Sequence, residues 1–374
     1  MNEEILGAEI GTGALQSPED YRYVNLGHLA GAIFTSLPDT YHIDYSKVPD
    51  LNQRKIGACT AHAASEIRMH RRLRKAGSTP VFSPRFVYAL SKGLDGVLPL
   101  SNQGTYPVMP LKMGVKYGFA TTNTIDNNTL LSFDEYVYNR DVTKIPQEAY
   151  QEARKYKIPG YVQVGQFKNI TEQELKTAII KSDDGVNITM PVGKEWWTSA
   201  DGRISWNAKD ILPIRHPIKV LSGHDITATG YEMENGRCKI FFRNEWGHLW
   251  ANDDNGWFYL DQHTLSEAWM ITTVPKHILK VVKSLPKKEH FAYHWDRILF
   301  SGMTGIDVQF LQIALKILKV FPFEQPVTEY YGPITQSAVT KFQTEYGVAS
   351  PQEILAARGA MGPKTKAVLN NLFK

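Results

Sequence analysis

The sequence predicts an α+β fold for most of its 374 residues, followed by a small all-α domain at the C-terminal end. Three observations support this prediction. A helix is expected to begin at Cys59, two strands joined by an Asn-Gly turn are expected around Asn235, and amphipathic helices follow from Ser301. A chain of this length has room for two or three domains.

The stretch from Leu51 to Leu73 predicts an extended approach, a glycine turn and a helix that ends near Gly77. A cysteine at the start of a helix meets unpaired N–H groups and a partial positive charge, and both favour the thiolate. Gln53 lies six positions before Cys59, where its amide could face an oxyanion. A cysteine is more often a small buried apolar residue, so a nucleophile also requires a histidine and an orienting polar residue.

Two later segments supply these residues. Ser222–Tyr231 reads SGHDITATGY and contains His224, and Arg243–Trp250 reads RNEWGHLW and contains Asn244. The strands that we expect on either side of the Asn-Gly turn bring His224 and Asn244 to the same open end of a hairpin. A direct pairing of these two residues centres the turn on Glu234, so a longer loop or a bulge must absorb the difference.

With the cysteine stretch, these segments resemble the three signature blocks of papain-like cysteine peptidases, in the family's order. The resemblance covers Leu37 to Thr273. It implies a papain-like two-lobed fold, with a helical left lobe and an antiparallel β-barrel-like right lobe. The chain departs from the family pattern at Thr60, where tryptophan is common, and at Glu245, where the family has serine.

The resemblance also implies a mechanism. His224 would take the proton of Cys59 to give a thiolate–imidazolium pair, and Asn244 would orient the imidazole. The Cys59 N–H and the Gln53 amide would face the oxyanion of the tetrahedral intermediate. Peptide-bond hydrolysis would proceed through a thioester, and no metal or organic cofactor is needed.

Three further residues are candidates for substrate binding: Gly104, Gly223 and Trp246. Gly104 fits the place where family members pair their backbone with the substrate, although a plain loop glycine is an equally good interpretation. In the family the tryptophan after the asparagine block shields the His–Asn hydrogen bond from water. His62 and His70 have no partner at zinc spacing, so we interpret them as surface or capped histidines.

Other local patterns predict the remaining elements. One helix is expected to begin at Ser83-Pro84. Another is expected to begin at the capping box that starts at Thr171 and to end near Lys181. Val186–Val192 predicts an alternating strand, and Gly256–Leu260 resembles the closing strand of the family domain. Trp196-Trp197 predicts packing more than a sugar platform.

Residues 301–374 resemble the small three-helix peptidoglycan-binding domain. Apolar positions such as Val308 and Leu311 share one helix face, and "Gly-Pro-x-Thr" precedes two of the helices, at Gly332 and Gly362. The matched residues are those of core and turns, so the resemblance indicates the fold more strongly than the ligand. It implies peptidoglycan as a partner.

These patterns divide the chain into four parts: residues 1–36 as an arm or a short pro-segment, 37–274 as the peptidase domain, 275–300 as a basic linker, and 301–374 as the peptidoglycan-binding-like domain. The net charge of +4 is small, and the linker lysines are expected to be solvated, with no nucleic-acid partner. If Cys59 is the nucleophile, no structural disulfide remains, which suggests folding in a reducing cytosol, and Cys238 is expected to be structural. We find no secretory signal and no run long enough to span a membrane.

The leading hypothesis is a cysteine endopeptidase that acts at the bacterial cell wall, on the peptide stems of peptidoglycan or on proteins embedded in the wall. A wall-binding module without a signal peptide also suits a phage lysin or a component of the phage particle. A protease that processes phage structural proteins, with a C-terminal domain that docks protein, is the second hypothesis. An inactive scaffold is the third, and the complete set of Gln53, Cys59, His224 and Asn244 argues against it.

Overall fold

The protein is described from a computed structural model. The structure describes residues 12–17, 23–26, 36–97, 103–165, 168–193, 196, 212–213, 220–247, 255–260, 265–274, 291–322, 325 and 327–373. The chain divides into two compact units, one formed by Met1–Glu19 and Ile33–Thr273, the other by Asp20–Ala32 and Val274–Lys374. In the described part, no helix is long and apolar enough to cross a membrane.

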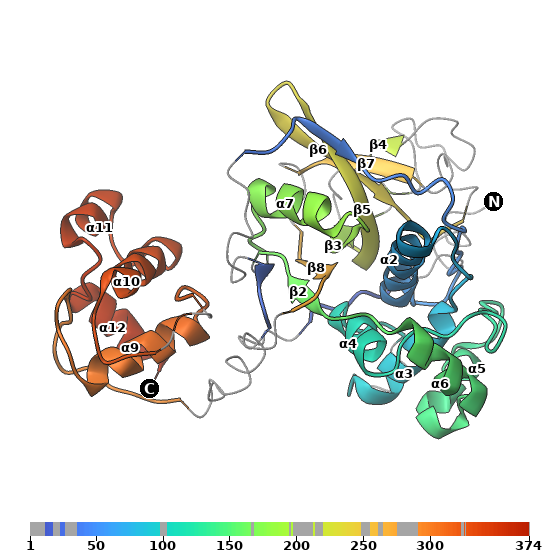
Figure 1. Ribbon diagram of the computed structural model, residues 1–374, viewed down its shortest axis with the longest axis horizontal. Helices are drawn as coiled ribbons and strands as arrows, with labels where there is room; N and C mark the ends of the chain where they lie inside the picture. Colours follow the sequence, from blue (N-terminus) through green and yellow to red (C-terminus); the bar gives the residue numbers. More distant parts are fainter. Residues whose placement is uncertain are drawn as a thin grey trace. The chain divides into compact units, whose positions relative to one another are not determined.

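The first unit is built on one mixed sheet with the strand order β2-β8-β3-β5-β6-β7-β4 (Figure 1). The bounds are β1 Thr40–His42, β2 Tyr161–Gln163, β3 Val186–Val192, β4 Leu212–Pro213, β5 Ser222–Glu234, β6 Arg237–Arg243, β7 Asn255–Tyr259 and β8 Glu267–Ile271. All pairs are antiparallel except β4 with β7. The long strand β5 pairs with β3 along its first part and with β1 near its end.

The predicted hairpin is confirmed. Strands β5 and β6 are joined at Asn235-Gly236, and both turn residues have positive φ, 52° and 77°, as a type I′ turn requires. The register shifts between Ala228 and Gly230, so Thr229 forms a bulge, one of the two features that the sequence allowed here; Thr227 pairs with Arg243, so His224 does not pair directly with Asn244. This shift sets which residues of β5 face the helices.

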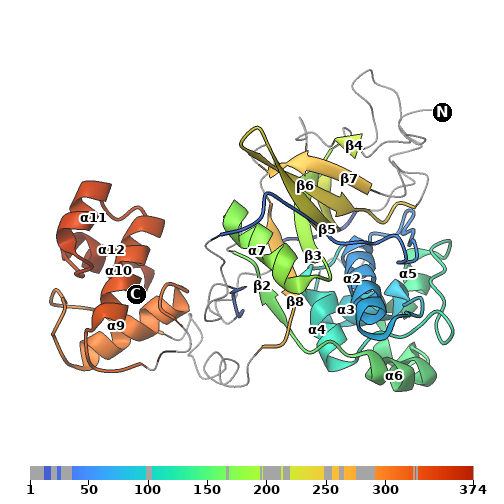
Figure 2. The same ribbon diagram turned by 45° about the horizontal axis from the view of Figure 1, so that its top comes forward.

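Helices cover the sheet and extend beyond it (Figure 2). The bounds are α2 Cys59–Ala76, α3 Pro84–Leu94, α4 Val108–Lys116, α5 Phe133–Tyr136, α6 Gln147–Ala153 and α7 Glu172–Ser182, with short 3-10 turns at Tyr138–Arg140, Val142–Lys144 and Arg154–Tyr156. Helix α2 packs on β3 and β5 on one side and on α3 and α4 on the other. It therefore lies between the sheet and the helices α3 and α4, whereas α7 packs on β3, β5 and β8 directly.

Sequence signals at the helix ends are largely confirmed. Gly77 ends α2 with a left-handed conformation, and Thr171 and Glu174 form the expected capping box of α7. Ser83 occupies the position before α3, but its hydroxyl donates to the Asp126 carbonyl and not to the helix.

Two strand predictions need correction. Strand β3 is almost wholly buried on both faces, because β5 and β8 flank it and helices cover it, so its residues do not alternate between core and solvent. The segment predicted as the closing strand is β7, but β8 follows it and pairs with β2 and β3.

The second unit contains the three predicted helices as α9 Ile306–Ile317, α10 Pro333–Glu345 and α12 Pro363–Leu372. A further short helix, α11 Pro351–Ala357, starts with a capping box formed by Ser350 and Glu353. The core of this unit also includes Phe291, Trp295 and Leu299, so it extends N-terminal to the predicted boundary at Ser301. The lysines of the predicted linker lie outside the described residues.

Candidate active site

Cys59 is the first residue of α2 and is completely buried. No side chain caps this end of the helix, and the N–H groups of Ala61 and His62 donate to the Ala58 carbonyl. Backbone N–H groups of Asp225, Gly13 and Thr60 donate to the sulfur and act to lower its pKa. The contact with Asp225 places the sulfur beside the start of β5, where His224 lies.

His224 and Asn244 form the second part of the site. The Nε2–H of His224 donates to Asn244 Oδ1 at 2.7 Å, and both side chains are buried. The opposite ring nitrogen, Nδ1, has no hydrogen-bond partner among the described residues. The free Nδ1 is the atom that a proton from a neighbouring thiol would reach.

Two tryptophans enclose the imidazole. Trp246 stacks on His224 with ring centroids 4.8 Å apart, and Trp196 meets the same ring edge-on at 5.7 Å. Trp246 is buried, so its position fits the shielding of the His–Asn bond more directly than contact with substrate. Trp196 packs as predicted, while Trp197 lies outside the described residues.

Gln53 lies beside the asparagine turn. Its backbone N–H donates to the Glu245 carbonyl at 2.9 Å, and the backbone of Asn52 pairs with that of Trp246 in an isolated antiparallel β-bridge. Its side-chain Nε2 donates to the Ile56 carbonyl at 3.3 Å. Gln53 is thus held between the asparagine turn and the turn that leads into α2.

Residues 12–17 of the N-terminal arm lie against this site. The arm pairs in parallel with Thr105 on one side, with Leu15 N–H donating to the Thr105 carbonyl at 3.0 Å. On the other side, Ala14 N–H donates to the Gly223 carbonyl at 3.0 Å, and Ser17 N–H donates to Glu267 Oε1 at 2.8 Å. The arm therefore bridges the segment before α4 and the sheet.

The two glycines predicted to bind substrate both border the arm. A Cβ atom on Gly104 would lie 2.6 Å from the Gly13 carbonyl oxygen, and one on Gly223 would lie 2.3 Å from the Ala14 carbonyl oxygen. Neither position tolerates a side chain while the arm is in place. The absence of side chains here lets one extended backbone approach another.

Burial dominates the electrostatics. It raises the pKa of Cys59 to about 12, against the three backbone N–H groups, and the negative potential of Asp225 acts in the same direction as burial. Burial lowers the pKa of His224 to about 4, although the bond to Asn244 opposes this. With the arm in place the site therefore favours neutral thiol and neutral imidazole, and not the thiolate–imidazolium pair expected from the sequence.

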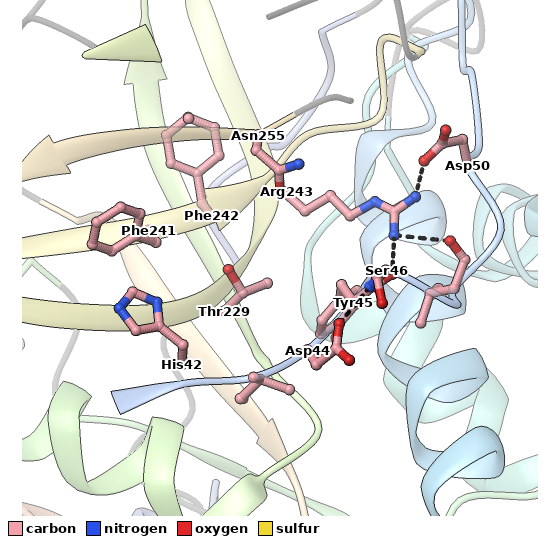
Figure 3. Close-up of a pocket in the computed structure, with 13 residues that line it drawn as sticks. His42, Asp44, Tyr45, Ser46, Asp50, Thr229, Phe241, Phe242, Arg243 and Asn255 are labelled. Atoms are coloured by element: carbon pink, nitrogen blue, oxygen red, sulfur yellow. Dashed lines mark hydrogen bonds and ion pairs between the residues drawn. The ribbon is translucent and has the colours of Figure 1, made fainter. Parts of the chain in front are cut away.

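Arg243, directly before Asn244, fixes the end of β6. It forms an ion pair with Asp50 and donates to the carbonyls of Tyr45 and Val48 at 3.2 and 3.0 Å (Figure 3). Its Nε lies 3.6 Å from the buried Glu66 carboxyl of α2. Arg243 thus joins β6, α2 and the segment that leads to Gln53, and it lines a cavity of about 500 Å³ with His42 and Asn255 among others.

Other candidate residues do not join the site as ligands. His62 and His70 are buried, contrary to a surface position, and they donate to the carbonyls of Ala58 and Asp44. Cys238 is a free buried cysteine on β6. Among the described residues, no cluster of three or more His, Cys, Asp or Glu could hold a metal ion.

Sequence reasoning missed three participants: Gly13, Asp225 and Glu245. Glu245 was visible as a departure from the family pattern, and its side chain lies 3.7 Å from His224 Nε2. Asp225 follows the histidine and accepts hydrogen bonds from Asn187 and Thr189. No sequence signal marked Gly13, because its role depends on how the arm folds back.

Comparison with known proteins agrees with both parts of the fold. Residues 304–351 match the family described as "Putative peptidoglycan binding domain". The chain is similar to the structure of xylellain, a cysteine protease from Xylella fastidiosa, at 21% identity and a TM-score of 0.56, with 71% of this chain and 97% of that chain covered. No curated protein matches the chain in sequence.

Two further structures are similar at 13% identity. One is digestive procathepsin L 3 of Tenebrio molitor larval midgut, with a TM-score of 0.50 over 72% of this chain and 78% of that chain. The other contains the cysteine protease and lectin-like domains of Cwp84, a surface layer associated protein of Clostridium difficile, with a TM-score of 0.52 over 70% of this chain and 55% of that chain. At these identities the likeness concerns the fold. The chain therefore combines the fold of papain-like cysteine proteases with a C-terminal segment of the peptidoglycan-binding type.

Proposed function

We propose that the protein is a cysteine endopeptidase in which Cys59 is the nucleophile, His224 the general base and acid, and Asn244 the residue that orients His224. The observation that carries this proposal is the 2.7 Å bond from His224 to Asn244, in a buried cluster with Cys59 at a helix start. Thiol, imidazole and carboxamide are the groups that thioester-forming hydrolysis requires. The Cys59 N–H and the Gln53 side chain would stabilise the oxyanion.

In the proposed reaction, the proton of Cys59 moves to Nδ1 of His224 as the sulfur attacks the substrate carbonyl carbon. The imidazolium then gives this proton to the leaving amine, and a thioester remains on Cys59. A water molecule, deprotonated by His224, hydrolyses the thioester and restores the thiol. No step needs a metal or an organic cofactor.

The same proposal makes the chain a latent enzyme. The arm covers Cys59, and its backbone takes the hydrogen bonds that Thr105 and Gly223 could offer to a substrate. Residues 1–36 would then act as a pro-segment, of which residues 12–17 form the inhibitory part. Activity would require the arm to leave this position, by cleavage or by displacement.

We propose the bacterial cell wall as the place of action, because residues 304–351 match a peptidoglycan-binding description. The substrate would be a peptide stem of peptidoglycan or a protein held in the wall, and a phage lysin or a phage particle component fits this combination of domains. The alternative is a protease that processes phage structural proteins, in which the C-terminal unit docks protein.

The test compares the full chain with Cys59→Ala on purified sacculi and on denatured casein, each with and without removal of residues 1–17. New amine termini are counted in a mildly reducing buffer. Cys238→Ala is the matched control, because it removes the other buried thiol, which lies on β6 away from α2.

Release from sacculi that needs Cys59 and not Cys238 supports a wall endopeptidase, whereas release from casein alone supports the processing protease. If no new amine termini are released from either substrate after removal of the arm, the proposed peptidase activity is refuted. Binding to sacculi that survives deletion of residues 291–374 would refute wall targeting by the C-terminal unit.

A further inference from the structure

We propose that Glu245 is a positioning residue for His224, and that its carboxylate favours the protonated imidazole which the reaction passes through. This inference rests on the proposed function. Glu245 Oε2 lies 3.7 Å from His224 Nε2, and both side chains are fully buried. That distance is too long for a direct hydrogen bond, but a charge so close to a fully buried imidazole acts strongly on it.

The backbone of Glu245 also sets the orientation of Asn244. The Glu245 N–H donates to Asn244 Oδ1 at 2.9 Å, and this same oxygen accepts the Nε2–H of His224. Two donors on one oxygen hold the carboxamide with its oxygen, and not its nitrogen, toward the imidazole. Nε2 therefore keeps its proton, and Nδ1 remains available to Cys59.

Contacts on both sides hold Glu245 in place. Its carbonyl accepts from Gln53 N–H at 2.9 Å, and the ring of the next residue, Trp246, stacks on His224. Two positions earlier, the guanidinium of Arg243 forms an ion pair with Asp50. The carboxyl group is thus fixed beside the imidazole by its backbone, as a positioning role requires.

The reaction creates a need for this carboxylate. His224 must carry a positive charge while the thioester forms, yet burial disfavours that charge and Asn244 offers a dipole only. The other titratable groups that face His224 are Cys59 and His62 from α2 and Asp225 from its own strand. Burial lowers the pKa of His62 to about 4, so it carries no charge at neutral pH, and Asp225 is bonded to Asn187 and Thr189 with burial raising its pKa.

Glu245 neither gains nor loses a proton in this reaction. The proton moves from Cys59 Sγ to His224 Nδ1 and then to the leaving amine, while the carboxylate stabilises the ion that exists between these transfers. The serine that the family has at this position carries no charge. The substitution Glu245→Ser therefore separates the electrostatic effect from the backbone contacts, which do not depend on the side chain.

The first test measures the imidazole pKa of His224 by NMR in the full chain with Cys59→Ala, so that no thiol titrates with it. The signal is assigned by its loss in His224→Ala. The titration is repeated with Gly13→Ala, because a Cβ there would lie 2.5 Å from the Gly57 carbonyl oxygen and displace the arm. We expect Glu245→Gln to lower the pKa of His224 by one pH unit or more once the arm is displaced.

The second test uses the pH profile of kcat/KM with the displaced arm. Glu245→Gln and Glu245→Ser should move the acid limb, along which His224 becomes the neutral base, about one pH unit lower and reduce kcat about tenfold, with KM nearly unchanged. The matched control is Asp184→Asn, since Asp184 is a buried carboxylate that pairs with Arg71 and Arg74. It should leave the limb where it is.

The two tests separate the failure of this inference from that of the proposed function. An imidazole pKa that Glu245→Gln does not change overturns the inference, and so does one that stays below 4 with the arm displaced and Glu245 present. If the NMR effect holds but no substrate is cleaved, the coupling of Glu245 to His224 stands and the peptidase proposal fails.

Discussion

The burial of Cys59 under the arm gives a prediction that can be worked out in numbers. Burial and the neighbouring Asp225 raise the pKa of the thiol from 9.0 to about 12. Alkylation follows the thiolate fraction, and each pKa unit changes that fraction about tenfold at neutral pH. If displacement of the arm returns the thiol to its ordinary value, the alkylation rate at pH 7.5 should rise about a thousandfold.

The assay follows iodoacetamide labelling of Cys59 by mass spectrometry in chains that carry Cys238→Ala. We compare the full arm, deletion of residues 1–17, and Gly13→Ala, which leaves the chain length unchanged. Gly362→Ala is the matched control, because a Cβ at Gly362 would meet no atom within 4 Å. It should label as slowly as the chain with the full arm.

Equal labelling rates in all folded variants would refute the reasoning, because the pKa of Cys59 would then not depend on the arm. A rise with the deletion but none with Gly13→Ala would show that the arm tolerates the extra methyl group. In that case the close approach of Gly13 to Gly57 would not be what seats the arm.

Three further predictions concern other parts of the chain. Burial raises the pKa of Asp184, but hydrogen bonds from His70 and Arg74 and the charge of Arg71 outweigh it and lower the pKa from 3.8 to about 2. The ionised carboxylate therefore stabilises the fold fully above pH 3.8, and about 2 kcal/mol of the free energy of unfolding should be lost as pH falls through 2. Urea unfolding of Asp184→Asn should not show this loss. Gln53→Ala should lower kcat about a hundredfold with little change in KM, and an unchanged kcat in steady-state kinetics would remove Gln53 from the oxyanion site. Phe342→Ala removes a fully buried ring from α10 and should destabilise the second unit by about 3–5 kcal/mol in calorimetry, with loss of sacculus binding but not of Cys59 alkylation.

The parts of the fold that the sequence predicted are those with local causes. Gly77 ends a helix because glycine adopts the left-handed conformation, and Asn235-Gly236 makes a type I′ turn for the same reason. Counting between the turn and the pair His224 and Asn244 predicted a longer loop or a bulge, and the structure has a bulge, at Thr229. Such features depend on a few neighbouring residues and leave a pattern in the sequence.

The parts that the sequence did not predict depend on distant contacts. Strand β3 reads as an alternating strand, but tertiary packing covers both of its faces. The helix start at Cys59 predicts a lowered thiol pKa, yet burial of the thiol and the negative potential of Asp225, which is distant in sequence, reverse the direction. Glu245 was noticed only as a departure, since its distance from His224 depends on the packing of the turn.

The bulge at Thr229 has a consequence for how the site tolerates changes in chain length. The Asn-Gly turn fixes which face each residue of β6 occupies, and Thr229 then resets the alternation for the earlier part of β5. Because Ala228 stays opposite Phe242 and Gly230 opposite Phe241, deletion of Thr229 alone would restore regular pairing and leave the side chain of His224 on its present face of the sheet. Residues inserted at the Asn235-Gly236 tip change neither alternation, so the hairpin can lengthen at its tip, and the extra residue at Thr229 lets β5 lose one residue without turning the histidine away from the cysteine.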